Sequence, residues 1–141
     1  MGERGMIKNN SEVMDWLFNY AFDNGVSMMF MQLDSYTPPA TNVHTKRILM
    51  NNNWHNKDEL PMQFAHEIGH IMLEQEYSGL LYYTPSKFGM EFEANKYAIN
   101  LLLPFYMDEK EPGQVNIYDF MEYFSIPGHL EDAVTEAVKN Y

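Results

Sequence analysis

One ten-residue stretch decides the fold of this chain, and it reads Phe64-Ala65-His66-Glu67-Ile68-Gly69-His70-Ile71-Met72-Leu73. If the stretch is helical, residues four apart lie one turn apart on the same face, with Cβ atoms about 5–6 Å apart. The imidazoles of His66 and His70 can then reach one metal ion, and Glu67 can act on a water molecule held there. The stretch therefore predicts a helix that carries a metal site.

The apolar residues around the two histidines support the helix. Four of them recur at i, i+4, i+7 and i+8 and would form a stripe that faces a core: Phe64, Ile68, Ile71 and Met72. His66 and His70 lie together, off that stripe. Two structural histidines are the alternative interpretation, because any short motif also occurs by chance. A helix with one apolar face and one face of paired imidazoles favours the metal site.

A third ligand must come from elsewhere in the chain. The sequence contains no cysteine, so nitrogen and oxygen are the donors available. The metzincin extension needs a glycine three residues after the second histidine and a histidine six residues after it, but these positions hold Leu73 and Glu76. The candidates are therefore acidic residues, and two of them lie in the segment Glu91-Phe92-Glu93-Ala94-Asn95.

Helix geometry distinguishes Glu91 from Glu93. The two residues lie about 200° apart around a helix, so they cannot both face one ion. Glu91 is the predicted ligand, because Asn95, one turn further on, could hydrogen-bond a metal-binding imidazole and fix its tautomer. Glu93 stays the alternative, and Glu74 is an outside candidate because it lies one turn past His70. An acidic residue near a helix end is also often simply solvated.

Periodicity and turn residues predict the remaining elements of an α+β fold. We expect a helix over residues 11–23, a strand over 26–33, a turn or loop over 36–41, a strand over 46–51, the motif helix from about 58 to 77, a helix over 87–103, a packing segment over 117–124 and a helix over 130–139. Ser11, Asp58 and Ser86 are the expected N-caps, and Pro104 is the expected end of a helix. The first helix is apolar around most of its circumference, which predicts deep burial. A small sheet of two or three strands should pack on a helical body that carries the histidine motif.

Length and charge limit the functions that the chain can have. Its 141 residues suit a single domain over residues 1–141. A formal net charge of -11 at pH 7 argues against direct binding to nucleic acid or to an anionic membrane, since both rely on basic patches. The charge suits a cationic protein partner, or it simply keeps the protein soluble. With no apolar run of about 20 residues and no signal peptide, we expect a cytoplasmic protein.

Two blocks of the sequence resemble a known family. The first is the stretch from Phe64 to His70, and the second runs Glu91-Phe92-Glu93-Ala94-Asn95-Lys96-Tyr97-Ala98 and closes with Leu101-Leu102-Leu103-Pro104. They resemble the ImmA/IrrE metallopeptidases of phages and mobile elements, which are of the gluzincin type, and the similarity covers about residues 45–104. The resemblance implies a minimal zincin-like fold, a Zn2+ cofactor held by His66, His70 and Glu91, and Glu67 as the catalytic residue.

The resemblance also implies an activity and a partner. Members of the family are linked to cleavage of a helix-turn-helix repressor encoded nearby, so the expected function is zinc-dependent hydrolysis of a peptide bond in a DNA-binding repressor. Tyr77, Tyr82 and Tyr83 are candidates for stabilising the oxyanion, although packing is the simpler role for each. The alternative is a non-catalytic zinc-containing interaction module or anti-repressor that acts by stoichiometric binding. A structural zinc site normally adds a fourth protein ligand, which favours the enzyme.

Overall fold

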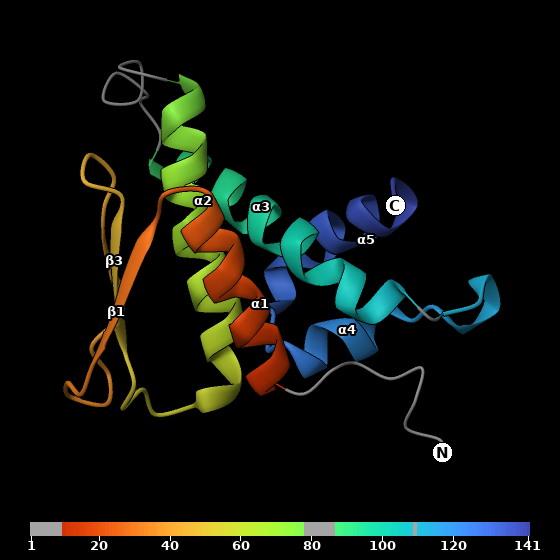
Figure 1. Ribbon diagram of the computed structural model, residues 1–141. Coiled ribbons are helices and arrows are strands. Elements are labelled where there is room, and N and C mark those ends of the chain that lie inside the picture. Colours follow the sequence, from red (N-terminus) through yellow and green to blue (C-terminus); the bar gives the residue numbers. More distant parts are fainter. Residues whose placement is uncertain (1–9, 78–86, 109) are drawn as a thin grey trace.

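Helix α2 (Leu60–Tyr77) carries the histidine motif and lies in the middle of the molecule (Figure 1). The computed structural model describes residues 10–77, 87–108 and 110–141. Phe64, Ile68 and Ile71 are fully buried, and Met72 packs partly buried against the same core. The predicted apolar stripe is therefore confirmed. Because this stripe faces the core, the histidines are left on another face of the helix.

Three strands form a small mixed sheet in the order β1-β3-β2, with bounds β1 (Ser27–Met31), β2 (Ala40–Asn42) and β3 (Arg47–Asn51). β3 pairs with β1 in parallel and with β2 in antiparallel orientation. Successive side chains of a strand point to opposite faces. Ile48 and Met50 of β3 are buried, whereas Met29 of β1 lies on the outer face and is 60% exposed. One face of the sheet thus packs on the helices, and the other faces solvent.

The remaining helices complete the molecule around α2, with bounds α1 (Asn10–Asp23), α3 (Lys87–Met107), α4 (Ile117–Tyr123) and α5 (Glu131–Lys139). α1 contacts α2 and β1, while α3 packs on α2 and α5 on the side away from the sheet (Figure 1). The described residues also contain three short 3-10 turns, namely η1 (Lys57–Glu59), η3 (Pro112–Gln114) and η4 (Gly128–Leu130). This arrangement confirms the predicted α+β class, with a three-stranded sheet on a helical body.

A glycine sets the distance between α2 and α3. A Cβ atom built on Gly69 would lie 3.1 Å from the carbonyl oxygen of Ala94 and 3.1 Å from the Cβ of Tyr97. These atoms belong to the α3 backbone and the base of a side chain, so they cannot move without the helix. The missing side chain at Gly69 therefore lets α3 approach α2 closely, beside the two histidines.

The prediction that Pro104 ends its helix is wrong. α3 continues to Met107, and the backbone N–H of Asp108 donates a 3.0 Å hydrogen bond to the carbonyl of Pro104. A proline inside a helix leaves the carbonyl four residues earlier without its helical partner. That carbonyl belongs to Asn100, an exposed residue where water can take the place of the missing N–H. Burial of Tyr106 one half-turn later holds the last turn of the helix in place.

The prediction that residues 36–41 form only a turn or loop is also wrong at its end. Pro38 and Pro39 do lie outside the sheet, because neither can donate a hydrogen bond to a ladder. The chain then enters β2 directly at Ala40, and Thr41 pairs with Ile48 of β3. A strand of three residues is too short to display a periodic pattern in the sequence.

The residue predicted to cap the start of α2 lies elsewhere in the structure. Asp58 is not the N-cap of the helix but lies inside the turn η1, which immediately precedes it. Asn56 caps that turn, since its side-chain oxygen accepts a 3.1 Å hydrogen bond from the backbone N–H of Asp58. α2 itself begins at Leu60, and Pro61 occupies its first turn as predicted.

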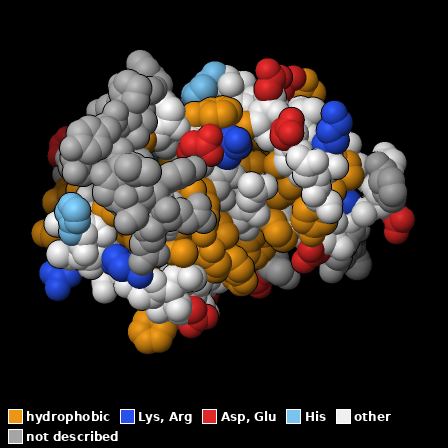
Figure 2. Space-filling model, turned by 90° about the horizontal axis from the view of Figure 1, so that it is seen from above, with side chains coloured by type: hydrophobic (Ala, Val, Ile, Leu, Met, Phe, Trp, Pro, Cys, Tyr) orange, Lys and Arg blue, Asp and Glu red, His pale blue; other side chains and the backbone are white. Residues whose placement is uncertain are grey.

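The first helix is less buried than the sequence suggests. It begins at Asn10, so Ser11 lies inside it, and its fully buried residues are Val13, Leu17 and Ala21. Trp16 is 42% exposed, and its ring stacks on a tyrosine of the same helix at the surface. Deep burial of α1 was therefore a wrong prediction, because only one face of the helix meets the core. Hydrophobic side chains also reach the surface elsewhere, as the face drawn in Figure 2 shows.

The other boundaries lie within a few residues of those predicted. β1 occupies 27–31 of the predicted 26–33, β3 occupies 47–51 of the predicted 46–51, and α2 ends at Tyr77. Ser86 and the tyrosines Tyr82 and Tyr83 lie outside the described residues. Within the described part of the chain, no helix combines the length and the apolar character needed to cross a membrane.

Candidate metal centre

The structure brings the two histidines of α2 and one glutamate of α3 together. The Nε2 atoms of His66 and His70 lie 2.8 Å and 3.4 Å from the same oxygen, Oε1 of Glu91. Potential ligand atoms of the three residues all lie within 4.8 Å of one another. Among the described residues, this trio is the group that could hold a metal ion. The i, i+4 spacing on α2 and the close approach of α3 at Gly69 together produce this convergence.

Oxygen atoms face both ring nitrogens of His66. Oδ1 of Asn95 lies 2.7 Å from Nδ1, and Oε1 of Glu91 lies 2.8 Å from Nε2. A neutral imidazole carries a single N–H, so it cannot donate to both oxygens at once. A cation between Nε2 and Glu91 removes this conflict, because Nδ1–H can then donate to Asn95 while Nε2 is free to bind the metal.

The donor set suits zinc in number, chemistry and spacing. Two imidazole nitrogens and one carboxylate oxygen are a ligand set of catalytic zinc sites, in which a fourth position remains open. With metal–ligand distances near 2.1 Å, tetrahedral coordination separates neighbouring ligand atoms by about 3.4 Å. The separation of His70 from Glu91 has this value, and His66 needs to move outward slightly to admit an ion. The three residues therefore fit a metal ion.

Partial exposure makes the trio accessible from solvent. The side chains of His66 and His70 are 16% and 17% exposed, and that of Glu91 is 43% exposed. A purely structural zinc site is normally closed by four protein ligands. An open site of three ligands has room for water and for a substrate group, which is the arrangement that catalysis requires.

Glu93 lies apart from this cluster. Its carboxylate is 3.7 Å from the ammonium group of Lys96, one turn further along α3, and both side chains are more than two-fifths exposed. The structure thus brings Glu91 to the histidines and leaves Glu93 in an ion pair at the surface. Glu74 belongs to α2, but its side chain lies outside the described residues. The ligand roles themselves stay predictions.

Glu67 has a partner that the sequence did not reveal. The hydroxyl of Thr41, on the sheet strand β2, donates a hydrogen bond to Oε1 of Glu67. The two residues are 26 positions apart, and both are partly buried. A lone threonine after two prolines carries no sequence signal for such a contact. The sheet therefore reaches the predicted catalytic residue directly.

Four of the five predicted site residues line one open cleft between α2, α3 and the segments before β2 and after α4. Its lining comprises Pro39, Glu59, Met62, Gln63, His66, Glu67, Glu91, Asn95, Ser125 and Pro127. His66, Glu67, Glu91 and Asn95 are thus on the wall of one cavity, beside apolar residues and a further carboxylate. The sequence analysis predicted the histidine, carboxylate and amide groups of this cleft. It did not predict that the segments around Pro39 and Ser125 would enclose them.

The sequence model of a peptidase family, the IrrE N-terminal-like domain, matches residues 23–127. The chain belongs to this family. The match contains the whole sheet, α2 and α3, and with them all five predicted site residues, so the resemblance to ImmA/IrrE metallopeptidases is confirmed. No curated protein and no solved structure gives a significant match to the chain.

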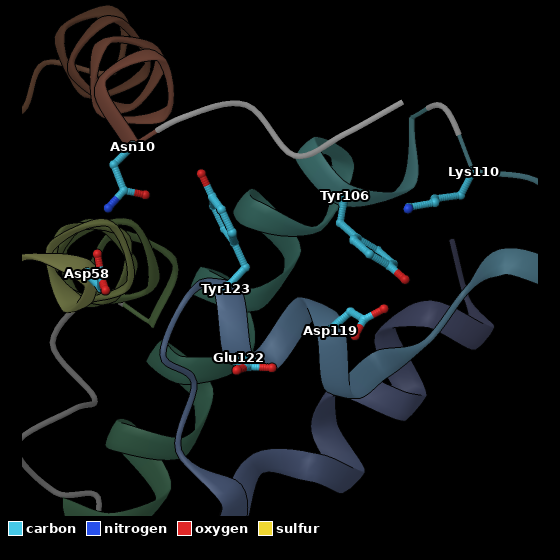
Figure 3. A pocket seen from close by; sticks show the side chains of 7 residues that line it. All are labelled: Asn10, Asp58, Tyr106, Lys110, Asp119, Glu122 and Tyr123. Atoms are coloured by element: carbon cyan, nitrogen blue, oxygen red, sulfur yellow. The ribbon is translucent and has the colours of Figure 1, made fainter. Parts of the chain in front are cut away.

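A second pocket of this IrrE-like chain lies near the N-terminal end of α2 (Figure 3). Its lining comprises Asn10, Asp58, Tyr106, Lys110, Asp119, Glu122 and Tyr123. The ammonium group of Lys110 lies 4.9 Å from the ring centroid of Tyr106, in a cation–π contact. Burial raises the pKa of Tyr123, and the negative charges of Asp58 and Glu12 raise it further. No histidine is among the described residues of this lining, and none of them belongs to the metal centre.

Proposed function

We propose that this member of the peptidase family is a zinc-dependent enzyme of the gluzincin type, which hydrolyses a peptide bond in a protein partner. One observation carries the proposal: Nε2 of His66, Nε2 of His70 and Oε1 of Glu91 converge. His66 and Glu91 lie on the wall of an open cleft, and Glu67, which follows His66 in sequence, lines the same wall. Membership of the peptidase family supports the same reaction.

Each residue of the cluster has a role in this proposal. His66, His70 and Glu91 hold the ion, and Asn95 accepts the Nδ1–H of His66, which keeps Nε2 unprotonated. When bound, zinc supplies positive charge that polarises the scissile carbonyl and lowers the pKa of water to about 7. The exposed side of the trio leaves space for the substrate carbonyl and the attacking water.

Glu67 moves the proton. Its carboxylate accepts a proton from the attacking water and then donates it to the nitrogen of the leaving amine. It lies beside His66 in sequence and lines the same cleft, so it can face the substrate without binding the metal. Tyr77, Tyr82 and Tyr83 stay candidates for oxyanion stabilisation, since their side chains lie outside the described residues.

A helix-turn-helix repressor of a phage or mobile element is the substrate that we propose. The chain carries a formal net charge of -11, and Glu59, Glu67 and Glu91 line the cleft. DNA-binding proteins carry basic surfaces to contact phosphates. Opposite charges accelerate the encounter of two proteins, and salt screens this attraction. Cleavage of such a partner should therefore slow as the salt concentration rises.

The test combines zinc content with cleavage of a purified helix-turn-helix repressor. We expect about one zinc per chain by elemental analysis, cleavage of that repressor by the wild type, and metal-loaded but inactive protein for Glu67→Gln. Correctly folded, metal-free protein under zinc-replete conditions would contradict the proposal. Equal relief of repression by wild type and Glu67→Gln would instead favour an interaction module that acts by stoichiometric binding.

A further inference from the structure

We propose that Thr41 is a positioning residue, which holds the Glu67 carboxylate in the orientation needed for proton transfer. The inference rests on the proposed role of Glu67 as the proton carrier. Its basis is the hydrogen bond from the Thr41 hydroxyl to Oε1 of Glu67. Among the described residues, Thr41 is the side chain that hydrogen-bonds Glu67.

The sheet presents the Thr41 hydroxyl from a fixed position. β2 is antiparallel to β3, and Thr41 pairs with Ile48, whose side chain is 2% exposed. Residues that pair directly across two strands point to the same face of the sheet, so Thr41 lies with Ile48 on the face that packs on the helices. A shift of β2 by one residue would turn Thr41 to the outer face, so the observed pairing keeps the hydroxyl directed at α2.

Hydrogen bonds also hold the turn between β2 and β3 in place. The side-chain oxygen of Asn42 accepts a 3.1 Å hydrogen bond from the backbone N–H of Thr45, inside the turn. The ammonium group of Lys46 donates a 2.8 Å hydrogen bond to the carbonyl of Asn24, which follows α1. These contacts connect the hairpin to the helical body, so Thr41 has little freedom to leave Glu67.

A glutamate needs such a contact because its side chain is long. Several rotatable bonds separate the carboxylate from the helix backbone, and ordering them costs conformational entropy. The hydroxyl engages Oε1 and leaves Oε2 as the acceptor for the proton of water. Misplacement of a reacting group by about 1 Å can reduce a rate about 100-fold. Thr41 thus acts through Glu67 and does not itself exchange a proton.

Two substitutions separate the hydroxyl from the shape of the side chain. Thr41→Val keeps the β-branched form and the preference for a strand but removes the donor. Thr41→Ser keeps the donor and removes a methyl group. Both should bind about one zinc per chain, because the Thr41 hydroxyl hydrogen-bonds Glu67, which is not one of the three proposed ligands. Equal zinc content shows that the site is intact.

The first readout is the side-chain conformation of Glu67, measured by scalar couplings in nuclear magnetic resonance of the zinc-loaded protein. We expect a single rotamer in wild type and Thr41→Ser, and averaging over several rotamers in Thr41→Val. A single Glu67 rotamer in Thr41→Val would overturn the proposal. This readout does not depend on finding a substrate.

The second readout is hydrolysis of the quenched-fluorescence library peptide that the wild type cleaves fastest. Thr41→Val should lower kcat at least 10-fold and leave KM within about twofold, while Thr41→Ser should stay within about threefold of wild type in both. Equal kcat values for wild type and Thr41→Val, or equally slow Val and Ser variants, would overturn the proposal. If no peptide is cleaved but the rotamer of Glu67 depends on the hydroxyl, positioning by Thr41 is supported and the proposed peptidase function is not.

Discussion

At the scale of single residues, each ring nitrogen of His66 faces one oxygen atom, and the two oxygens have different proposed roles. Asn95 faces Nδ1 and Glu91 faces Nε2, at 2.7 Å and 2.8 Å. We expect Asn95→Ala to lower zinc affinity about 10–100-fold, because the imidazole loses the partner that fixes its tautomer and orientation. Competition with a chromophoric chelator measures this affinity. Asn100→Ala, an exposed position of the same helix, is the control, and equal affinities of the two variants would refute the role of Asn95.

Glu91 and Glu93 offer a matched pair of carboxylates on one helix. Glu91→Gln should reduce zinc affinity more than about 100-fold, a larger loss than removal of an outer hydrogen-bond partner causes. Glu93→Gln removes the same charge but only loosens an exposed ion pair with Lys96, so zinc affinity should stay unchanged and stability should fall by less than about 1 kcal/mol. Equilibrium dialysis against buffered zinc distinguishes the two. A larger effect at Glu93 would restore it as the third ligand.

At the scale of elements, the contact between α2 and α3 controls whether ligands from two helices can meet. Gly69→Ala places a methyl group 3.1 Å from the carbonyl oxygen of Ala94, so α3 must move away. Overpacking costs about 1–3 kcal/mol, and the higher helix propensity of alanine offsets about 1 kcal/mol of it. We expect the free energy of unfolding to fall by up to about 2 kcal/mol and zinc affinity to fall several-fold, measured by chemical denaturation and by chelator competition.

Gly128→Ala is the control for that substitution. A Cβ atom on Gly128 would meet no other atom within 4 Å, so neither stability nor zinc affinity should change by more than a small amount. Unchanged zinc affinity in Gly69→Ala would show that α3 can shift without moving Glu91, and would contradict a role of this contact in the site.

Elements with a long periodic pattern could be predicted from the sequence, and short ones could not. The stripe of Phe64, Ile68 and Ile71 locates the core face of α2, and the one-turn spacing of Glu91 and Asn95 places both opposite His66. β2 has three residues and follows two prolines, so it has no pattern of its own. The contact between Thr41 and Glu67 depends on how β2 pairs with β3 and packs on α2, which is a property of tertiary structure.

The continuation of α3 through Pro104 illustrates the same limit. Local propensity places a stop at the proline, since its ring removes a helical hydrogen bond. Leu103 and Tyr106 on either side of it are buried, and their packing outweighs the local cost. Tertiary contacts therefore determine where this helix ends. They cannot be predicted from the local sequence around Pro104.

At the scale of the whole molecule, the sheet and the helices contribute different parts of the same site. α2 and α3 supply the proposed ligands, while β2 supplies the partner of Glu67. The hydrophobic core connects these parts, because the buried residues of α1, α2, α3 and β3 form one cluster. The cleft is thus built where helices and sheet meet, and its geometry depends on the fold as a whole.

Removal of zinc tests whether the metal serves the fold or the reaction. The core cluster includes neither histidine, and both side chains are only partly buried, so the fold should persist without the ion. A bound ligand still stabilises the folded state, by about 2.7 kcal/mol at a free concentration 100 times its Kd. We therefore expect a chelator to lower the Tm of the wild type while circular dichroism at room temperature stays unchanged.

Glu91→Gln is the control, and a chelator should not change its Tm, because this variant binds little metal. Unfolding of the wild type on zinc removal would instead identify a structural metal, as in zinc-finger domains, and would favour the interaction module over the enzyme.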